Sequence, residues 1–156
     1  MTENIRLSRI AITDRDATFD LLQHVEVMKY LGPRRPLSDA EAQAWFEHEF
    51  TQQKRFAFRL PVSGELVGFC GVTEIDGVDD FGYFLRRKFW GKGFAKKMCQ
   101  LAVSELAAST DFDQVKVFIA DSNVSSQKIA QYLGWKKYKA ASNDYEHGAL
   151  YQIKRP

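Results

Sequence analysis

The stretch that decides the fold is residues 86–97, which read RRKFWGKGFAKK. A strand-like run over residues 81–85 comes directly before it, and an apolar pattern at helical spacing starts within it and continues to residue 106. The sequence therefore predicts a glycine-containing loop between the end of a strand and the N-terminus of a helix. The first N–H groups of a helix have no partner inside the helix, and glycine lets an anion approach the backbone closely. Such a loop can bind a pyrophosphate.

Positive charge is concentrated around this loop, on Arg86, Arg87, Lys88, Lys92, Lys96 and Lys97. Two common phosphate-binding motifs do not fit, because the P-loop requires Gly-x-x-x-x-Gly-Lys-Ser/Thr and the dinucleotide motif requires three glycines at fixed spacing. Considered alone, the loop is equally compatible with a tight turn that carries a solvated basic face. The rest of the chain has to decide between these two interpretations.

The segments before the loop predict a mixture of helices and strands. Ser38 followed by Glu41 forms a capping box, which indicates that a helix begins there. The expected elements are a strand over residues 5–12, a helix over 17–31, a helix from Ser38 to about Gln52, and strands over 56–60, 66–72 and 81–85. Residues 74–80 are expected to form a short acidic stretch that leads into the last of these strands.

A second motif follows the loop helix. Residues 121–135 read DSNVSSQKIAQYLGW, and residues 115–119 before them alternate as a strand. Asn123 and the serines can open a helix, and Gly134 can end it. Two final strands are expected over residues 136–139 and 149–154.

The two motifs together resemble the GNAT superfamily of acetyltransferases. The CoA loop of that family has the pattern Gln/Arg-x-x-Gly-x-Gly/Ala, in which Gly93 and Ala95 occupy the two small positions, whereas Trp90 stands where Gln or Arg is expected. The form WGKGFA, preceded by Gly82-Tyr83, is similar to the branch that contains the RimJ/RimL ribosomal-protein acetyltransferases. The second family pattern, Asn-x-x-Ser followed by Leu-Gly-Phe, is matched at residues 123–135 with Trp135 in place of Phe.

The resemblance spans nearly the whole chain and implies one GNAT domain over residues 1–156. The expected fold is α/β (α+β), with a central, mixed, mostly antiparallel sheet of about six or seven strands flanked by about four helices. The co-substrate would be acetyl-CoA, and no metal is implied. The residues that the resemblance assigns to CoA are Phe84, Leu85, Arg86, Trp90, Gly91, Lys92, Gly93, Phe94, Ala95, Lys96, Asn123 and Ser126. For Asn123, contact with the pantetheine and capping of a helix are both open, and they do not exclude each other.

Members of this family transfer acetyl directly to the acceptor in a ternary complex, so the amine must be neutral when it attacks. A lysine-like amine with a pKa of ~10.4 is almost wholly protonated at pH 7, and a base or an acidic pocket must remove its proton. Asp80 is the first candidate for a base or a water-holding residue and Glu74 is the second. The alternative for each is a solvated acidic loop.

The group that assists the leaving thiolate is predicted less directly. Many relatives carry a tyrosine at the position that is Ala130 here, and Tyr132 lies about 200° away around a helix, so the tyrosine role is not transferred to it. In ribosomal-protein acetyltransferases the serine of Asn-x-x-Ser can serve the thiolate. We therefore hypothesise that Ser126 hydrogen-bonds the CoA sulfur, with a helix-start serine as the alternative.

Composition limits the other function classes. The chain has 156 residues with 22 basic and 20 acidic side chains, a net charge of +2, which argues against a nucleic-acid partner. No apolar stretch approaches the ~20 residues of a membrane span, and none follows the polar residues 1–6 as a signal peptide would, so we expect a cytoplasmic protein. Cys70 and Cys99 are expected to be buried free thiols.

The acceptor stays open at this stage. The branch resemblance favours a peptide or protein N-terminal amine, while a polyamine, an aminoglycoside or another small amine is the alternative. Two other classes remain: a CoA-binding module or sensor without catalysis, and an RNA-associated protein that uses the basic loop. The protein is expected to be a monomer or a homodimer.

Overall fold

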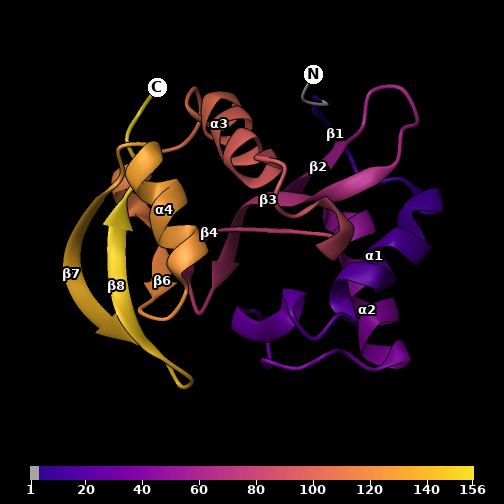
Figure 1. Ribbon diagram of the computed structural model, residues 1–156, viewed down its shortest axis with the longest axis horizontal. Coiled ribbons are helices and arrows are strands. Elements are labelled where there is room, and N and C mark those ends of the chain that lie inside the picture. Colours follow the sequence, from indigo (N-terminus) through magenta and orange to yellow (C-terminus); the bar gives the residue numbers. More distant parts are fainter. Residues whose placement is uncertain (1–3) are drawn as a thin grey trace.

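The computed structural model describes residues 4–156, which form eight strands and four α-helices (Figure 1). The strands are β1 (Arg6–Ser8), β2 (Arg55–Arg59), β3 (Leu66–Ile75), β4 (Val78–Leu85), β5 (Val115–Lys116), β6 (Phe118–Ala120), β7 (Lys136–Ser142) and β8 (His147–Gln152). The helices are α1 (Arg15–Leu22), α2 (Asp39–Gln52), α3 (Phe94–Leu106) and α4 (Val124–Tyr132). The predicted mixed fold is confirmed, but the strands form two sheets rather than one.

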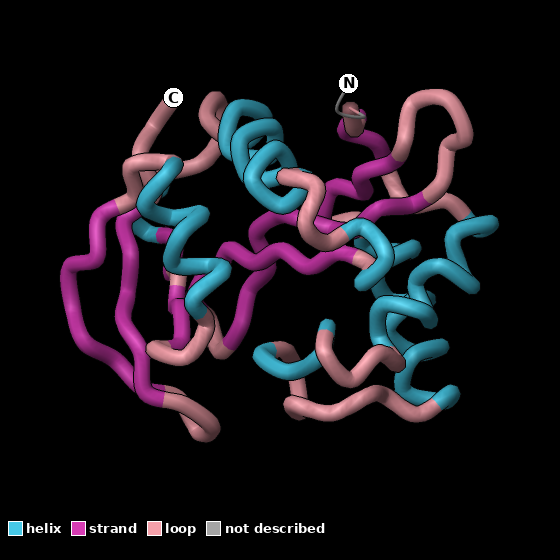
Figure 2. Tube along the Cα trace, in the orientation of Figure 1, coloured by secondary structure: helices cyan, strands magenta, loops and turns pink. Residues whose placement is uncertain are grey.

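The two sheets separate between β5 and β6, within the stretch that was predicted to form one strand over residues 115–119. The larger sheet has the order β1-β2-β3-β4-β5, antiparallel except for the parallel pair β4–β5, and the smaller has the order β6-β8-β7. Only Asp79 and Asp80 of β4 pair with β5, at Val115 and Lys116. After Lys116 the chain passes into β6 and pairs with β8 instead. In Figure 2 the smaller sheet lies to the left, and α1 and α2 lie beside the larger sheet to the right.

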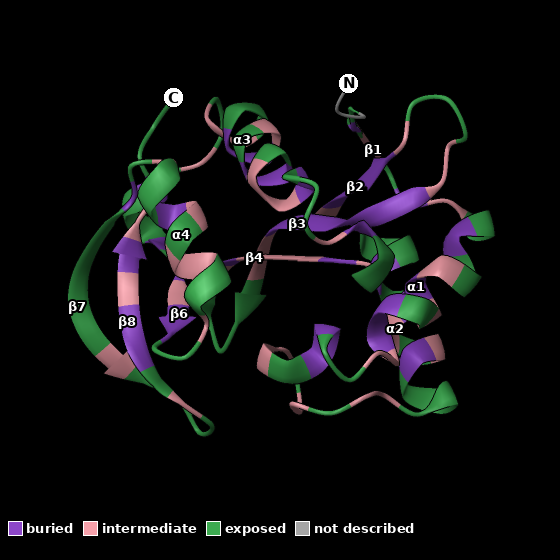
Figure 3. Cartoon of the chain, viewed as in Figure 1, coloured by how far each residue is buried: buried purple, intermediate pink, exposed green. Residues whose placement is uncertain are grey.

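The larger sheet separates two apolar cores. Phe81 and Leu85 of β4 face one core, which contains α3 and the buried Trp135. Phe84, on the alternate side of the same strand, packs with Phe69 and with Trp45 of α2. Figure 3 shows the burial along the chain, with buried residues on β2, β3 and β8 and an exposed β7 at the outer edge. The sheet therefore presents two different chemical faces along the same strand.

Several expected boundaries were wrong. The strand predicted over residues 5–12 is only β1, and a 3-10 turn, η1 (Ile12–Asp14), follows it. Two further differences lie near the site. The helix predicted over residues 17–31 ends at Leu22, and the chain continues to a 3-10 turn, η2 (Val27–Tyr30), because this path buries Val27 and Met28 against the core around α2. The acidic stretch is no loop: β3 and β4 extend into it and meet at a two-residue turn, in which Asp76 and Gly77 both have positive φ (52° and 78°). Two positive φ values suit a tight hairpin.

Candidate active site

A cleft of about 840 Å³ opens beside the last residues of β4. Among residues 4–156, β4 has no strand partner on its β5 side after Asp80, so its last residues border the cleft. The loop after β4, the start of α3, the start of α4 and η2 complete the lining. Ten of the twelve residues that the sequence assigned to CoA line this cleft: Phe84, Leu85, Trp90, Gly91, Gly93, Phe94, Ala95, Lys96, Asn123 and Ser126.

The N-terminus of α3 faces the cleft through Gly93, its N-cap residue. Gly91 and Gly93 have φ values of 77° and 78°, a left-handed conformation that favours glycine. A Cβ at either position would meet nothing within 4 Å, so the loop leaves open space there. No side chain caps this helix end, and its free N–H groups are available to an anion. The residues present therefore fit a pyrophosphate.

Trp90 explains the departure from the family's loop pattern. Its indole Nε1 donates to the carbonyl oxygen of Leu85 at 3.0 Å, and the Arg87 guanidinium lies 4.7 Å from the centre of its ring system. Arg87 in turn contacts the carboxylate of Glu26 at 3.3 Å. The tryptophan thus holds the loop against β4 through its indole N–H and also packs its ring against Arg87. A glutamine or arginine at this position would hold the loop only through its polar end group.

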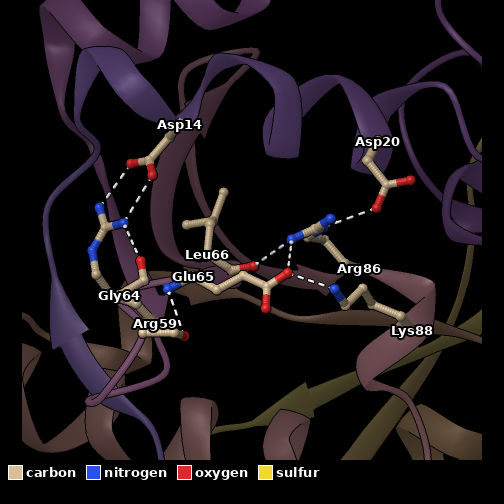
Figure 4. Close-up of polar contacts among 9 residues, drawn as sticks. Asp14, Asp20, Arg59, Gly64, Glu65, Leu66, Arg86 and Lys88 are labelled. Carbon is tan, nitrogen blue, oxygen red and sulfur yellow. Dashed lines mark hydrogen bonds and ion pairs between the residues drawn. The ribbon is translucent and has the colours of Figure 1, made fainter.

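Arg86 lies outside the cleft lining, and its charge is already engaged (Figure 4). Its Nε donates to Asp20 at 2.8 Å, and its Nη1 donates to Glu65 at 3.1 Å and to the carbonyl oxygen of Leu66 at 3.2 Å. These contacts anchor the β4–α3 loop, and the assignment of Arg86 to CoA stays a prediction. Lys92 also lies outside, and lines a smaller hollow beside Lys96 and Lys97.

Two hydroxyl groups meet within the cleft. The phenol Oη of Tyr83 and the Oγ of Ser126 are 2.6 Å apart, and this hydrogen bond joins β4 to α4. Burial raises the pKa of Tyr83 well above its usual value, so the phenol is protonated. In the sequence, Gly82-Tyr83 supports the branch resemblance but indicates no role for the tyrosine, and no pattern could reveal a contact across 43 residues.

The start of α4 has the predicted cap. The Oδ1 of Asn123 accepts a hydrogen bond from the backbone N–H of Ser126 at 3.3 Å, and the same residue lines the cleft. The capping role is thus present, while contact with a pantetheine stays a prediction. Ala130, at the family's tyrosine position, is 1% exposed. Tyr132 is exposed at the cleft lining, with the Nζ of Lys96 3.7 Å from the centre of its ring.

The two candidate bases lie on opposite faces of the larger sheet. Asp80 is opposite Thr73 in the β3–β4 register, and Glu74 is one residue further along β3, so its side chain points to the other face. Asp80 is half-buried, and this burial raises the pKa of its carboxyl to about 6, against the opposing charges of Lys116 and Arg55. Glu74 is exposed. Neither lines the main cleft; Asp80 shares a face with Phe84 and Glu74 shares the other face with Tyr83, and both of these β4 residues line it.

The segment between α1 and α2 closes one side of the cleft. The Tyr30 hydroxyl hydrogen-bonds the hydroxyl of Ser122 at 2.9 Å, and Arg34 Nε donates to Glu146, before β8, at 3.0 Å. Tyr30 lines the cleft. An acceptor entering from this side would pass between these contacts and β4.

Two further features bear on the class of protein. Within residues 4–156, no helix combines the length and the apolar character needed to cross a membrane, and no three His, Cys, Asp or Glu side chains gather as a metal site would require. Cys70 and Cys99 are buried and free, as predicted. The uncapped N-terminus of α3 and the paired hydroxyls lie in one cleft, an arrangement that suits a ligand with a pyrophosphate at one end.

Comparison with known proteins gives the family. A family model described as "Acetyltransferase (GNAT) domain" matches residues 4–136, and the chain belongs to this family. The protein is therefore an acetyltransferase whose co-substrate is acetyl-CoA and whose acceptor is an amine.

Individual relatives agree with this assignment. The uncharacterized N-acetyltransferase p20 of Bacillus licheniformis is 28% identical over 93% of this chain and 85% of its own length. The crystal structure of a GNAT-family acetyltransferase from Bacillus anthracis has a TM-score of 0.74 at 16% identity, covering 98% of this chain and 95% of the other. A chimera of the spermidine N-acetyltransferase SpeG from Vibrio cholerae and hSSAT has a TM-score of 0.72 at 15% identity, covering 96% and 95%. These two structures show the shared fold.

Proposed function

We propose that this enzyme transfers the acetyl group of acetyl-CoA to the α-amine of a peptide or protein, as the resemblance to the RimJ/RimL-like branch suggests. The amine attacks the thioester carbon within a ternary complex, a C–N bond forms and the C–S bond breaks. Asp80, directly or through a water molecule, receives the proton that the amine loses. One domain over residues 1–156, a cytoplasmic location and a monomeric or homodimeric state stay predictions from the sequence.

The observation that carries this proposal is the Tyr83–Ser126 hydrogen bond of 2.6 Å in the cleft. A protonated Tyr83 can donate to the Oγ of Ser126, which leaves the serine proton free to point elsewhere. The start of α3 lies along the same cleft and suits the pyrophosphate of CoA. A CoA molecule lying between these two points would bring its sulfur toward Ser126, whose hydroxyl then stabilises the departing thiolate.

The experiment measures CoA release from acetyl-CoA with a peptide that has a free N-terminal alanine. We expect Ser126→Ala to lower kcat by about 100-fold, as loss of one donor to a developing negative charge does elsewhere. Tyr83→Phe should cause a smaller loss in the same direction. Ser104→Ala, on the exposed side of α3, serves as the control and should match the wild type. An unchanged kcat in Ser126→Ala would refute the role of this hydroxyl.

A polyamine acceptor is the second candidate, since a chimera of a spermidine N-acetyltransferase shares the fold. The same assay with spermidine separates the two. A higher kcat/KM for spermidine than for the peptide would refute the peptide acceptor and leave the acetyl transfer standing.

A further inference from the structure

A row of three residues on β4 borders an open space next to the cleft. Asp80, Gly82 and Phe84 alternate along the strand and so share the face that carries α2. Gly82 contributes no side chain, and a Cβ built on it would meet nothing within 4 Å. Its neighbour in the β3 register, Gly71, differs: a Cβ there would lie 3.0 Å from the Cα of Arg55. We call the open space above Gly82, between Asp80 and Phe84, the Gly82 notch.

Aromatic rings form the wall of the Gly82 notch on the side of Phe84. The ring centres of Phe84 and Trp45 are 5.8 Å apart in an edge-to-face arrangement. The Arg55 guanidinium lies 5.2 Å from the centre of Trp45 and 5.9 Å from that of Phe84. Phe84 also lines the main cleft, so this residue borders both spaces. A group that extends from the cleft past Phe84 would reach Gly82 and then Asp80.

The charged side chains near the Gly82 notch differ in whether they form an ion pair. Arg55 is paired with Glu49, whose side chain is 2% exposed. Of the acidic residues bordering the α1–α2 segment, Glu26 pairs with Arg87 and Glu146 pairs with Arg34. Asp80 has no ion-pair partner within 4 Å in the part of the chain that the structure describes, residues 4–156. Lys116, its register partner on β5, and Arg55 act on this carboxylate from a greater distance and oppose the rise that burial causes in its pKa. The notch therefore offers one carboxylate that is outside any ion pair, which suits a single ammonium group.

We propose that the Gly82 notch binds the acceptor, with its amine at Asp80 and a small side chain above Gly82, and that it selects singly charged α-amines. The inference rests on the proposed acetyl transfer and names the acceptor class. A glycine, alanine or serine residue fills the space that Gly82 leaves, whereas a β-branched residue meets the backbone and the Phe84 ring. A second ammonium, as in a polyamine, that extends along the Phe84 side of the notch approaches the Arg55 guanidinium, which lies 5.9 Å from the centre of the Phe84 ring.

Substitution at Gly82 tests this without disturbing the fold. Its φ is not in the left-handed region and a Cβ has room, so Gly82→Ala should be at least as stable as the wild type. Acetyl-CoA should raise the unfolding temperature of both proteins equally, because Gly82 does not line the cleft. Ala140→Val, on the exposed strand β7, adds volume far from the notch and is the control.

The readout is kcat/KM for glycinamide, alaninamide, valinamide and spermidine. The wild type should favour alaninamide over valinamide and over spermidine by about 10-fold or more. Gly82→Ala should lower kcat/KM for alaninamide by about 10-fold, mainly through KM, and affect glycinamide less. The control should show the wild-type ranking.

Three other results of these measurements would each overturn a different part of the proposal. An unchanged ranking in Gly82→Ala would overturn the notch and leave the proposed acetyl transfer intact. A wild-type preference for spermidine or valinamide would overturn the selection of small, singly charged amines. Binding of acetyl-CoA without turnover of any of the four amines would overturn the proposed function together with the notch.

Discussion

Replacing Asp80 by asparagine should make the protein more stable at neutral pH and nearly inactive. Burial raises the pKa of the Asp80 carboxyl from 3.8 to about 6, although Lys116 and Arg55 act against this shift. The fold therefore disfavours the charged carboxylate relative to the neutral acid. Asparagine has almost the same shape and carries no charge, so it avoids the cost of burying a charge.

The size and the pH dependence of this gain follow from the two pKa values. A shift of about 2 units corresponds to about 3 kcal/mol, and we expect about 1–3 kcal/mol because water reaches the half-buried carboxylate. Below pH 3.8 the acid is protonated in both states and the cost is absent. As the pH rises, the unfolded chain loses its proton first, so the cost grows up to about pH 6 and is complete above it.

The assay is urea unfolding at pH 4 and pH 7.5, followed by tryptophan fluorescence. The gain in the free energy of unfolding should be largest at pH 7.5 and fall below about 1 kcal/mol at pH 4. Asp79→Asn is the matched control, since Asp79 is the adjacent, exposed residue of β4, and it should change stability by less than about 0.5 kcal/mol at either pH. An equal gain at both pH values, or no gain, would refute the reasoning.

Asp80→Asn should lower the activity of the enzyme, although it raises the free energy of unfolding. A base must be ionised to accept a proton, so wild-type kcat/KM should fall as the pH drops through about 6. Asp80→Asn should lower kcat by about 100-fold or more and lose this acid limb. If the variant keeps the wild-type rate across the pH range, the base lies elsewhere.

Two further substitutions test the framework around the site. Asp14→Ala should cost about 3–5 kcal/mol in urea unfolding, because it leaves the buried Arg59, now 2.7 Å from the Asp14 carboxylate, without a counter-charge. Asp16→Ala, which removes an exposed pair, should cost under about 1 kcal/mol, and similar losses for both would contradict this. Gly93→Val should abolish the stabilisation by acetyl-CoA, about 2.7 kcal/mol at 100 times Kd. Gly77→Val imposes the same strain at φ 78° far from the cleft and should keep it, so equal loss in both variants would count against the phosphate loop.

Local features were predicted well from the sequence. Ser38 and Glu41 form the expected capping box, with hydrogen bonds of 2.9 and 3.1 Å between side chains and backbone. Gly93 begins α3 and Gly134 ends the second motif's helix with a φ of 76°. Trp135, standing for the family's phenylalanine, packs edge-to-face on Phe81 at 5.4 Å. Such features depend on a few neighbouring residues, so a short stretch of sequence contains the necessary information.

The site itself was predicted only in part. The loop and the start of α4 were identified as its borders, because each is a local motif. The loss of pairing between β4 and β5 after Asp80, which creates the cleft, depends on β6 pairing with β8 at Ile119 and its neighbours. No spacing along the chain indicates where a strand leaves one sheet for another.

The sequence by itself determined the class of the protein, since its two glycine-containing motifs, their order and the capped helices are all local. The tertiary structure alone decided the roles of individual side chains. Arg86 is held by Asp20 and Glu65, and Tyr83 meets Ser126 across 43 residues. The physical reason is that a charge or a hydroxyl can bond any partner that the fold brings within about 3 Å, and distant segments supply those partners.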